Sequence, residues 1–313
     1  MAQSTAALIQ PPQPRSPTRI VPMAALKHLT VRSNRHGLLH LAAFAMLLLS
    51  TGLVVFAAMG THWLVPAMFL HGVVLVHLFA LQHECSHFTV FANRRLCAVV
   101  GWICGFVLCI PPTFFRHEHI KHHTHTQIAG EDPELIPLPD SVWSYMLYLS
   151  ALPYWYRQVS GLIRRALGQL TDEEQGFLRA SVREPVVYES RVMLTLYATV
   201  IVLMLTFDWT TPIYFWWLPA VLGEPVMRLI RMTEHVGRPL VTDMIQNTRT
   251  SYVSRPLRFL CWNMNYHTEH HYAPAVPYHA LPALHAALGA HVTAARGYLG
   301  AHRDIARQVR MQR

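Results

Sequence analysis

The sequence predicts an all-α integral membrane protein with four transmembrane helices in two hairpins and a cytosolic helical cap that carries histidine motifs. Three observations indicate this class. Charged residues make up only 14 % of the 313 residues, against roughly 25 % in soluble proteins. The mean hydropathy is positive, at +0.23. Long uncharged apolar runs follow one another in pairs, and about 20 apolar residues are enough for a helix to cross a bilayer.

The first predicted hairpin joins the apolar runs 38–59 and 63–81 through a short uncharged turn. Residues 1–30 precede it, and we expect them to be disordered because Pro, Ser, Thr and Gln dominate this segment. Basic residues cluster before the first run, so the positive-inside rule predicts a cytoplasmic N-terminus. Two crossings then return the chain to the cytoplasm near His83.

The second predicted hairpin joins runs 192–207 and 212–230, which leaves the C-terminus on the cytoplasmic side as well. A shorter apolar run, 96–110, lies between the hairpins and has an ambiguous length for a crossing. We expect it to dip into the membrane and return, because a full crossing would place the histidines before and after it on opposite faces. The aromatic segment 143–156 predicts an interfacial helix.

Charge and cysteine usage exclude other classes. The formal net charge is +9, from 26 basic and 17 acidic residues. Cytoplasmic loops of membrane proteins are enriched in Lys and Arg, so topology accounts for this balance, and we expect no nucleic-acid partner because the sequence contains no such motif. The five cysteines lack CxxC spacing, which predicts neither a disulfide scaffold nor a zinc knuckle.

Three histidine motifs stand just beyond apolar runs or in the polar segments that follow: HECSH (83–87), HIKHH (119–123) and HTEHH (267–271). On a helix, positions i, i+3 and i+4 share one face, so each motif can direct its imidazoles to a common point. Their number exceeds the three protein ligands of a catalytic zinc, so two metals fit better. Imidazole alone does not choose among iron, copper, nickel and zinc. The candidates are His83, His87, His119, His122, His123, His267, His270 and His271, with His235 after the last apolar run.

These three motifs, in this order and flanked by these hydrophobic pairs, resemble the membrane-bound fatty acid desaturase superfamily over residues 38–290. The stretch "WNMNYHTEHHYAPAVPYHALPALH" is similar to the bacterial branch that includes rhizobitoxine-type desaturases. The resemblance implies a non-haem di-iron centre on the cytosolic side, with the eight motif histidines and His235 as ligands and O2 as co-substrate. Arg231 departs from the stearoyl-type pattern, which has Asn four residues before the extra histidine.

The predicted domain organisation follows from these motifs. Residues 31–290 form the membrane desaturase-like domain with its cytosolic di-metal site, and 291–313 form a C-terminal amphipathic helix or tail. Within the last apolar run, Glu224 and Arg228 stand at i and i+4. We expect these two residues to form an ion pair.

Carboxylates beside the histidines are candidates for orienting the imidazoles. Ligating histidines commonly donate their second ring N–H to a carboxylate or a carbonyl, and a glutamate adjoins a histidine in each motif and before His235. The alternative for any one of them is a solvated helix face. The candidates around the metals are Glu84, Glu118, Glu234, Asn263 and Glu269.

The resemblance implies an O2-dependent di-iron oxidoreductase, in the first place a desaturase that introduces a double bond into a fatty-acyl or similar aliphatic substrate. A membrane di-iron hydroxylase of an aliphatic substrate is the first alternative, because related histidine motifs occur in alkane hydroxylases. An intramembrane zinc metalloprotease would use HECSH with Glu84 as general base, but it leaves both HxxHH motifs unexplained. A metal transporter would have coordinating groups inside several spans.

The partners are expected to be a lipid or other aliphatic substrate, the membrane and a separate electron donor. The cysteines show no iron–sulfur pattern and no cytochrome b5-like domain is recognisable, so we expect a donor such as ferredoxin with its reductase. The Arg residues of segment 157–183 suit an acidic partner. We expect a bacterial inner membrane protein with both termini and the metal site in the cytoplasm.

Overall fold

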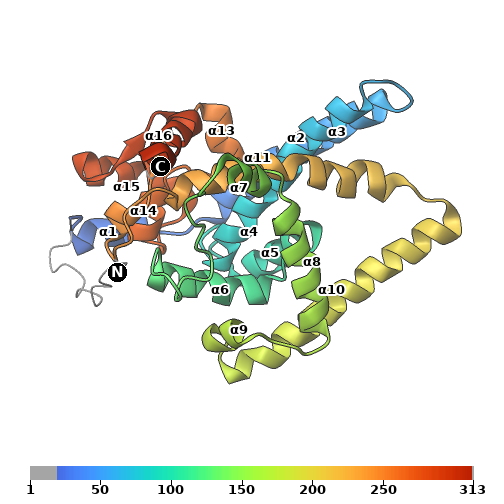
Figure 1. The fold of residues 1–313 in the computed structure, drawn as a ribbon, viewed down its shortest axis with the longest axis horizontal. Helices are drawn as coiled ribbons and strands as arrows, with labels where there is room; N and C mark the ends of the chain where they lie inside the picture. Colours follow the sequence, from blue (N-terminus) through green and yellow to red (C-terminus); the bar gives the residue numbers. More distant parts are fainter. Residues whose placement is uncertain (1–19, 312–313) are drawn as a thin grey trace, which may run out of the picture.

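The computed structural model describes residues 20–311 and is built almost entirely of helices (Figure 1). Its only described sheet is a parallel pair of two-residue strands, β1 (Thr250–Ser251) and β2 (Ala294–Ala295). Three helical segments are long and apolar enough to cross a membrane: α2 (Asn34–Ala58), the joined α3 and α4 (Leu64–Ser86) and α10 (Ala180–Phe207). The chain is therefore an all-α integral membrane protein.

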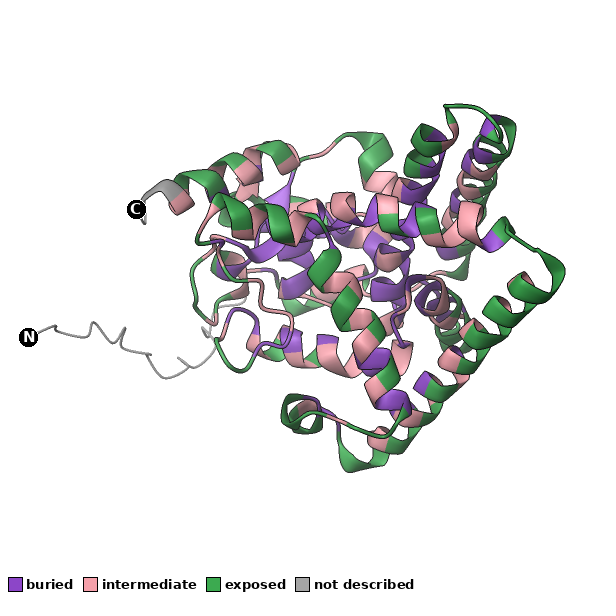
Figure 2. Cartoon of the chain, turned by 45° about the vertical axis from the view of Figure 1, so that its right-hand side comes forward, coloured by how far each residue is buried: buried purple, intermediate pink, exposed green. Residues whose placement is uncertain are grey.

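The exposed side chains mark the lipid-facing surface. Only 11 % of the most apolar window of α10 and 22 % of that of α2 are buried inside the protein. Figure 2 shows buried residues concentrated in the centre of the molecule, away from the exposed length of α10. Large exposed apolar patches on a soluble protein mark contact with a partner or a membrane, and here their length matches a bilayer span.

The N-terminal segment differs from the expectation of disorder over 1–30. Residues 1–19 lie outside the described part, but α1 (Met23–Leu29) is helical. The side chain of Val21 is 1 % exposed, and its backbone N–H donates to Tyr272 Oη at 3.2 Å. Burial of the apolar residues around α1 against the C-terminal part therefore holds this segment, although its composition is that of a disordered one.

Helices α3 (Leu64–Val76) and α4 (Leu78–Ser86) form one span that is interrupted only at His77. The hairpin between α2 and α3 is held by His71, whose Nδ1 lies 2.8 Å from Thr51 Oγ1. The α4 end of this span reaches into the buried centre of the protein (Figure 1). The first histidine motif thus stands at the end of the span that lies in the centre of the protein.

Helix α11 (Leu218–His235) follows the π-helical turn η1 (Ile213–Trp217) and packs tightly against α3. A Cβ placed on Gly72 would lie 1.9 Å from the carbonyl oxygen of Pro219, and one on Gly223 would lie 2.3 Å from the Gly72 carbonyl. Neither helix has room for a side chain at this crossing. The two glycines therefore let α3 and α11 approach backbone to backbone.

The predicted fourth span, 212–230, is helical, but α11 is not among the apolar spans of the described chain. Four charged residues, Glu224, Arg228, Arg231 and Glu234, are buried along it. Glu224 and Arg228 form the expected pair, with Nη2 to Oε1 at 2.6 Å. The inner half of α11 is thus a buried polar helix of the protein interior.

Helices α5 (Arg94–Leu108) and α6 (Pro112–His125) meet at 97°, the geometry of a broken span or a re-entrant loop. The bend occurs at Cys109, which adopts left-handed backbone angles with φ 60°, and before two prolines that begin a new helix. Helix α5 packs back along α4, and α6 also contacts α4. The bend therefore brings the second histidine motif beside the first.

The aromatic segment 143–156 forms two helices rather than the single one expected. Helix α7 (Val142–Leu149) ends before Ala151, whose left-handed backbone (φ 60°) starts α8 (Leu152–Ala166) in a new direction. Helix α9 (Asp172–Phe177) follows, with a capping box between Thr171 and Glu174. Such a cap satisfies the free N–H groups of a short helix.

The C-terminal part closes over the centre with short elements. The expected amphipathic C-terminal helix is α16 (Gly297–Met311), and the Nε2 of His302 bonds the Leu229 carbonyl at 2.9 Å, which packs α16 against α11. The remaining elements are α12 (Met244–Asn247), α13 (Arg255–Leu260), α14 (His267–Tyr272), η2 (Tyr278–Ala280), α15 (Leu281–Leu288) and η3 (Gly289–His291).

Candidate metal centre

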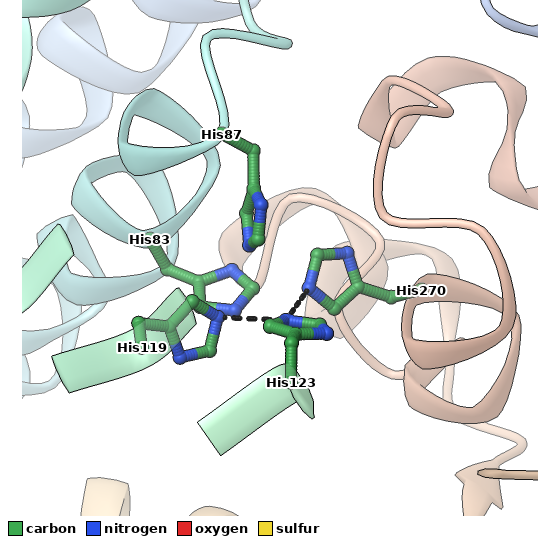
Figure 3. Close-up of side chains that lie close together, drawn as sticks. All are labelled: His83, His87, His119, His123 and His270. Carbon is green, nitrogen blue, oxygen red and sulfur yellow. Dashed lines mark hydrogen bonds between the residues drawn. The ribbon is translucent and has the colours of Figure 1, made fainter. Parts of the chain in front are cut away.

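The nine predicted histidines converge into two clusters. In each cluster one ring nitrogen per residue lies within 4.8 Å of all the others. The first cluster, drawn in Figure 3, combines residues of α4, its C-cap, α6 and α14, and the second combines residues of α6, α11 and α14. The first contains His83, His87, His119, His123 and His270; the second contains His122, His235, His267 and His271.

Each HxxHH motif contributes to both clusters, whereas the sequence predicted one common point per motif. His119 and His123 belong to the first cluster, and His122 belongs to the second. In a helix with 3.6 residues per turn, positions i and i+4 are ~40° apart around the axis, whereas i+3 and i+4 are ~100° apart. A motif of this spacing on a helix between two sites therefore serves both.

The ring nitrogens of the first cluster face one another. His123 Nε2 lies 2.9 Å from His119 Nε2 and 3.0 Å from His270 Nε2 (Figure 3). His119 Nδ1 donates to Glu134 Oε1 at 2.7 Å, so in the neutral imidazole its Nε2 carries a lone pair. Lone pairs that face one another across such distances repel unless a proton or a cation lies between them.

Two imidazoles of the second cluster are oriented in the same way, with Nδ1 toward an acceptor and Nε2 toward the centre of the cluster. His122 Nδ1 donates to Asp132 Oδ1 at 2.8 Å, and His235 Nδ1 lies 3.3 Å from the Asn247 carbonyl. Both partner atoms are oxygens that accept, so in the neutral imidazoles the Nε2 atoms carry the inward lone pairs. The Nε2 atoms of His235 and His267 are 2.8 Å apart.

Burial and the donor set both fit metal binding. In the described part of the chain, Nε2 atoms of four further cluster histidines are buried without a hydrogen-bond partner: His83, His87, His122 and His271. Two nitrogens that bind one ion at ~2.1 Å and about 90° are ~3.0 Å apart, which matches the observed separations. Such inward lone pairs, fixed from behind by carboxylates and carbonyls, are the arrangement of metal-binding histidines.

The α14 histidines are neutral. Burial lowers the pKa of His267, His270 and His271 well below the ordinary 6.5, and neighbouring imidazoles lower it further. A histidine binds metal in its neutral form. These rings are therefore ready to bind metal without losing a proton at neutral pH.

Two carboxylates that contact candidate ligands were not predicted from the sequence. Asp132 and Glu134 come from the acidic loop after α6 and bond His122 and His119. Burial by itself raises the pKa of Glu134, but His122 and Arg231 outweigh it and hold this pKa below its ordinary value. The only sequence signal was an acidic cluster about ten residues after the second motif.

Two of the predicted carboxylates lie near the clusters. Glu84 Oε1 is 3.7 Å from His270 Nδ1, and Glu84 Oε2 accepts from Thr89 Oγ1 at 2.7 Å. Glu234 Oε1 is likewise 3.7 Å from His267 Nδ1. Both lie behind α14 histidines, just beyond hydrogen-bond distance.

The other three predicted residues have different partners. Glu269 accepts from Thr250 Oγ1 at 2.5 Å and bonds His285, which is outside both clusters. Asn263 donates to the Tyr278 carbonyl. Glu118 is partly buried and bonds no histidine within residues 20–311. Adjacency in sequence does not fix the direction of a carboxylate, and the loop after α6 occupies the position behind His119. The role of these three residues around the metals stays a prediction.

A small cavity lies beside both clusters, against His83 of the first and His267 of the second. It offers about 20 Å³ to the centre of a water molecule, enough for one water or an atom group of that size. Most of its wall is apolar. The lining also includes His77, Phe79, Met227, Ile230, Arg231 and Met264.

Fold and site thus define an integral membrane protein with a two-part, all-histidine metal centre. Residues 60–302 match the family model described as fatty acid desaturase. The chain belongs to the fatty acid desaturase family.

Individual relatives carry desaturase names. The chain is 28 % identical over 115 residues to a Delta(12) fatty acid desaturase of Mortierella isabellina. This match covers 37 % of the chain and 28 % of the relative. It is 24 % identical over 236 residues to a sphingolipid delta(4)-desaturase of Drosophila melanogaster, a match that covers 70 % of the chain and 64 % of the relative. It is 23 % identical over 227 residues to an sn-1 oleoyl-lipid 12-desaturase of Anabaena variabilis, a match that covers 66 % of the chain and 63 % of the relative. The matches thus span less than two thirds of the length of each relative.

Proposed function

We propose that the protein is an O2-dependent di-iron desaturase that introduces a double bond into a fatty-acyl or similar aliphatic substrate. The observation that carries this proposal is the pair of all-histidine clusters, each of which contributes a histidine to the lining of one cavity. Family membership supports iron as the metal, and the relatives named for fatty acids, oleoyl lipid and sphingolipid support an aliphatic substrate.

In this proposal the five histidines of the first cluster hold one iron and the four of the second hold the other. When bound, the irons supply the O2 chemistry needed to break an unactivated C–H bond. Asp132 and Glu134 orient His122 and His119 through the Nδ1–H groups and keep their Nε2 lone pairs directed inward. This preorganisation reduces the rearrangement that binding would otherwise need.

The protein also shapes the place where the substrate reacts. The apolar side chains of Phe79, Met227 and Met264 line the cavity beside His83 and His267. They favour an aliphatic segment and exclude bulk water from the metals. The exposed apolar surfaces of α2 and α10 support entry of the substrate from the membrane.

The alternatives of another class receive less support. In a zinc protease, Glu84 would act as a base on water, but it accepts from Thr89 Oγ1 and from the Tyr278 backbone N–H. It lies behind His270 rather than in the cavity lining. A hydroxylase would use the same two clusters, so the product separates it from a desaturase.

Lipid and metabolite profiling of a heterologous host that produces the full chain tests the proposal. We expect a new double bond with the wild-type chain, none with His267→Ala, and retention with His125→Ala, which lies outside both clusters. Two irons per purified chain are expected. A hydroxylated product would overturn the desaturase assignment and keep the di-iron one, whereas a single zinc would overturn both.

We also propose a bacterial inner-membrane location, with two helical hairpins and with both termini and the metal clusters in the cytoplasm. Basic residues before the first run support this orientation, by the positive-inside rule. The first hairpin comprises α2 and the α3–α4 span, and the second comprises α10 and α11. In Figure 1 both pairs extend to the same side, away from α14 and α16.

An external electron donor, such as ferredoxin with its reductase, completes the proposal. A surface hollow of about 300 Å³ is lined by Arg238, Arg249 and Arg307, and by Asp304, which pairs with Arg307 at 3.5 Å. Arg249 donates to the carbonyls of Thr233 and Val236. These two residues flank Glu234 and the candidate ligand His235. Burial, and then Arg238, lower the pKa of Arg249 to about 10, as expected for a cation without a paired carboxylate.

We propose this hollow rather than the segment 157–183 as the docking surface, because Arg249 in its lining bonds the end of α11 that carries His235. In the segment 157–183, Arg164 and Arg165 share Glu174, at 2.6 and 2.9 Å, so part of their charge is compensated. Charge complementarity steers association. A carrier bound at the hollow would lie next to the end of α11, which carries His235 of the second cluster.

A further inference from the structure

We propose that Arg231 is a positioning residue that couples the two metal clusters through the carboxylates behind them. This inference rests on the proposed metal-binding function. Arg231 is a buried residue of α11 that belongs to neither cluster. Its side chain lines the cavity beside His83 and His267.

Arg231 lies at the centre of a row of side chains that is hydrogen-bonded as far as His119 on one side and ends 3.7 Å from His267 on the other. Its Nη2 donates to Glu134 Oε2 at 2.6 Å, and its Nη1 donates to Glu234 Oε2 at 2.7 Å. The other oxygen of Glu134 accepts from His119 Nδ1 at 2.7 Å, in the first cluster. The other oxygen of Glu234 lies 3.7 Å from His267 Nδ1, in the second. The row therefore runs from one cluster to the other.

The guanidinium fixes the orientation of both carboxylates. A planar fork with several N–H donors can hold two acceptors in set directions, which a lysine ammonium cannot do. Each glutamate has one oxygen on Arg231, so its second oxygen is directed at an imidazole. Rotation of either carboxylate would break a charge-assisted hydrogen bond that is shielded from water, where such bonds are strong.

Charge explains why the two carboxylates act together. Glu134, Arg231 and Glu234 are all at least nine-tenths buried at the side chain. Without Arg231, two buried negative groups would face the same space with no cation between them, a costly arrangement. One carboxylate would then turn away from the other, and the imidazole in front of it would lose its negative neighbour. A change at either cluster therefore reaches the other through Arg231.

The same helix provides a matched control. Arg228 is one turn earlier, is also buried, and pairs with Glu224 at 2.6 Å. This pair contacts no histidine of either cluster among the described residues. Substitution of Arg228 removes an equivalent buried guanidinium and leaves the row intact.

The test is anaerobic loading of purified full-length protein with ferrous ion against a competing chelator. Iron per chain is measured for wild type, Arg231→Gln, Arg231→Lys and Arg228→Gln. We expect Arg231→Gln to weaken binding of both ions by about 10–100-fold, the range for loss of a group behind a ligand. Arg231→Lys should fall between, and Arg228→Gln should load like wild type. Thermal unfolding of the metal-free variants gives the matched measure of fold damage.

A second experiment measures the coupling between the two clusters, separately from the effect of Arg231 on iron affinity. Glu134→Gln and Glu234→Gln are combined in a double-mutant cycle, with iron affinity as the readout. We expect non-additive effects when Arg231 is present and additive effects in the Arg231→Gln background. Additive effects in both backgrounds, or equal loading of Arg231→Gln and Arg228→Gln, would overturn the inference. The proposed function fails in a different way, namely when wild type itself does not hold two irons.

Discussion

His119 Nδ1 donates a 2.7 Å hydrogen bond to Glu134 Oε1, a residue fifteen positions later in the chain. The bond fixes the tautomer of His119, because only the opposite nitrogen then remains free for a metal. It also makes the loop after α6 part of the site. Asp132, two residues before Glu134, fixes the tautomer of His122 in the same way.

This relationship predicts opposite results for two glutamates. Glu134→Gln should lower iron affinity or turnover by about 10–100-fold, because the amide cannot provide the negative acceptor behind His119. Glu118→Gln should leave iron content near two per chain, since this carboxylate bonds no histidine in the described part of the chain. Metal analysis and turnover of both variants check the prediction. Equal effects would contradict the placement of the two carboxylates.

Adjacent histidines should bind different ions. His122 and His123 are neighbours in the sequence but belong to different clusters. Each single alanine variant should therefore lose mainly one of the two irons, and the double variant should lose both. Iron analysis together with Mössbauer spectra of the remaining ion would distinguish the two single variants. Identical spectra in both would show that the two residues share one ion.

The crossing of α3 and α11 gives a prediction for stability. Gly72→Ala places a Cβ 1.9 Å from the Pro219 carbonyl oxygen, so the helices must separate, and overpacking of this kind costs about 1–3 kcal/mol. Gly52→Ala is the control, because its Cβ would meet His71 at an ordinary 3.7 Å. Thermal unfolding in detergent should show a lower Tm for the first variant only. A comparable loss in both would argue against a close crossing at Gly72.

The proposed donor surface predicts a charge-dependent KM. Arg238→Glu with Arg307→Glu should raise the KM for reduced ferredoxin about tenfold, because steering across a charged face is worth at least this much at low salt. Turnover with a small chemical reductant should not change. Arg179→Glu, an exposed residue of segment 157–183, is the control. An effect confined to Arg179→Glu would move the docking surface back to that segment.

The sequence predicted the all-α membrane class and the desaturase family because apolar runs and repeated histidine spacings are local features. It also predicted the Glu224–Arg228 pair, which needs only one helical turn. The helix over 23–29 was missed because it depends on burial against distant residues such as Tyr272. The closer resemblance to rhizobitoxine-type desaturases stays a prediction.

The carboxylates of the site were harder to predict for a physical reason. Asp132 is directed toward His122 by the turn it organises, in which its oxygens accept from the backbone N–H groups of Gln127 and Glu134. The row through Arg231 likewise joins residues of α11 to a loop 97 positions earlier. Neither arrangement leaves a periodic pattern in the sequence. Glutamates next to histidines were the available signal, and the geometry supports only Glu84 and Glu234 near the clusters.

The composition of the two clusters sets the order of events during synthesis of the protein. His123 and His270 face each other although 147 positions separate them. A nascent chain that has inserted only its first hairpin holds two of the five histidines of the first cluster and none of the second. Residues 267–271 contribute to both clusters, so neither cluster has its full ligand set before this segment is synthesised. A product that terminates before residue 267 would lack one of the five histidines of the first cluster and two of the four of the second.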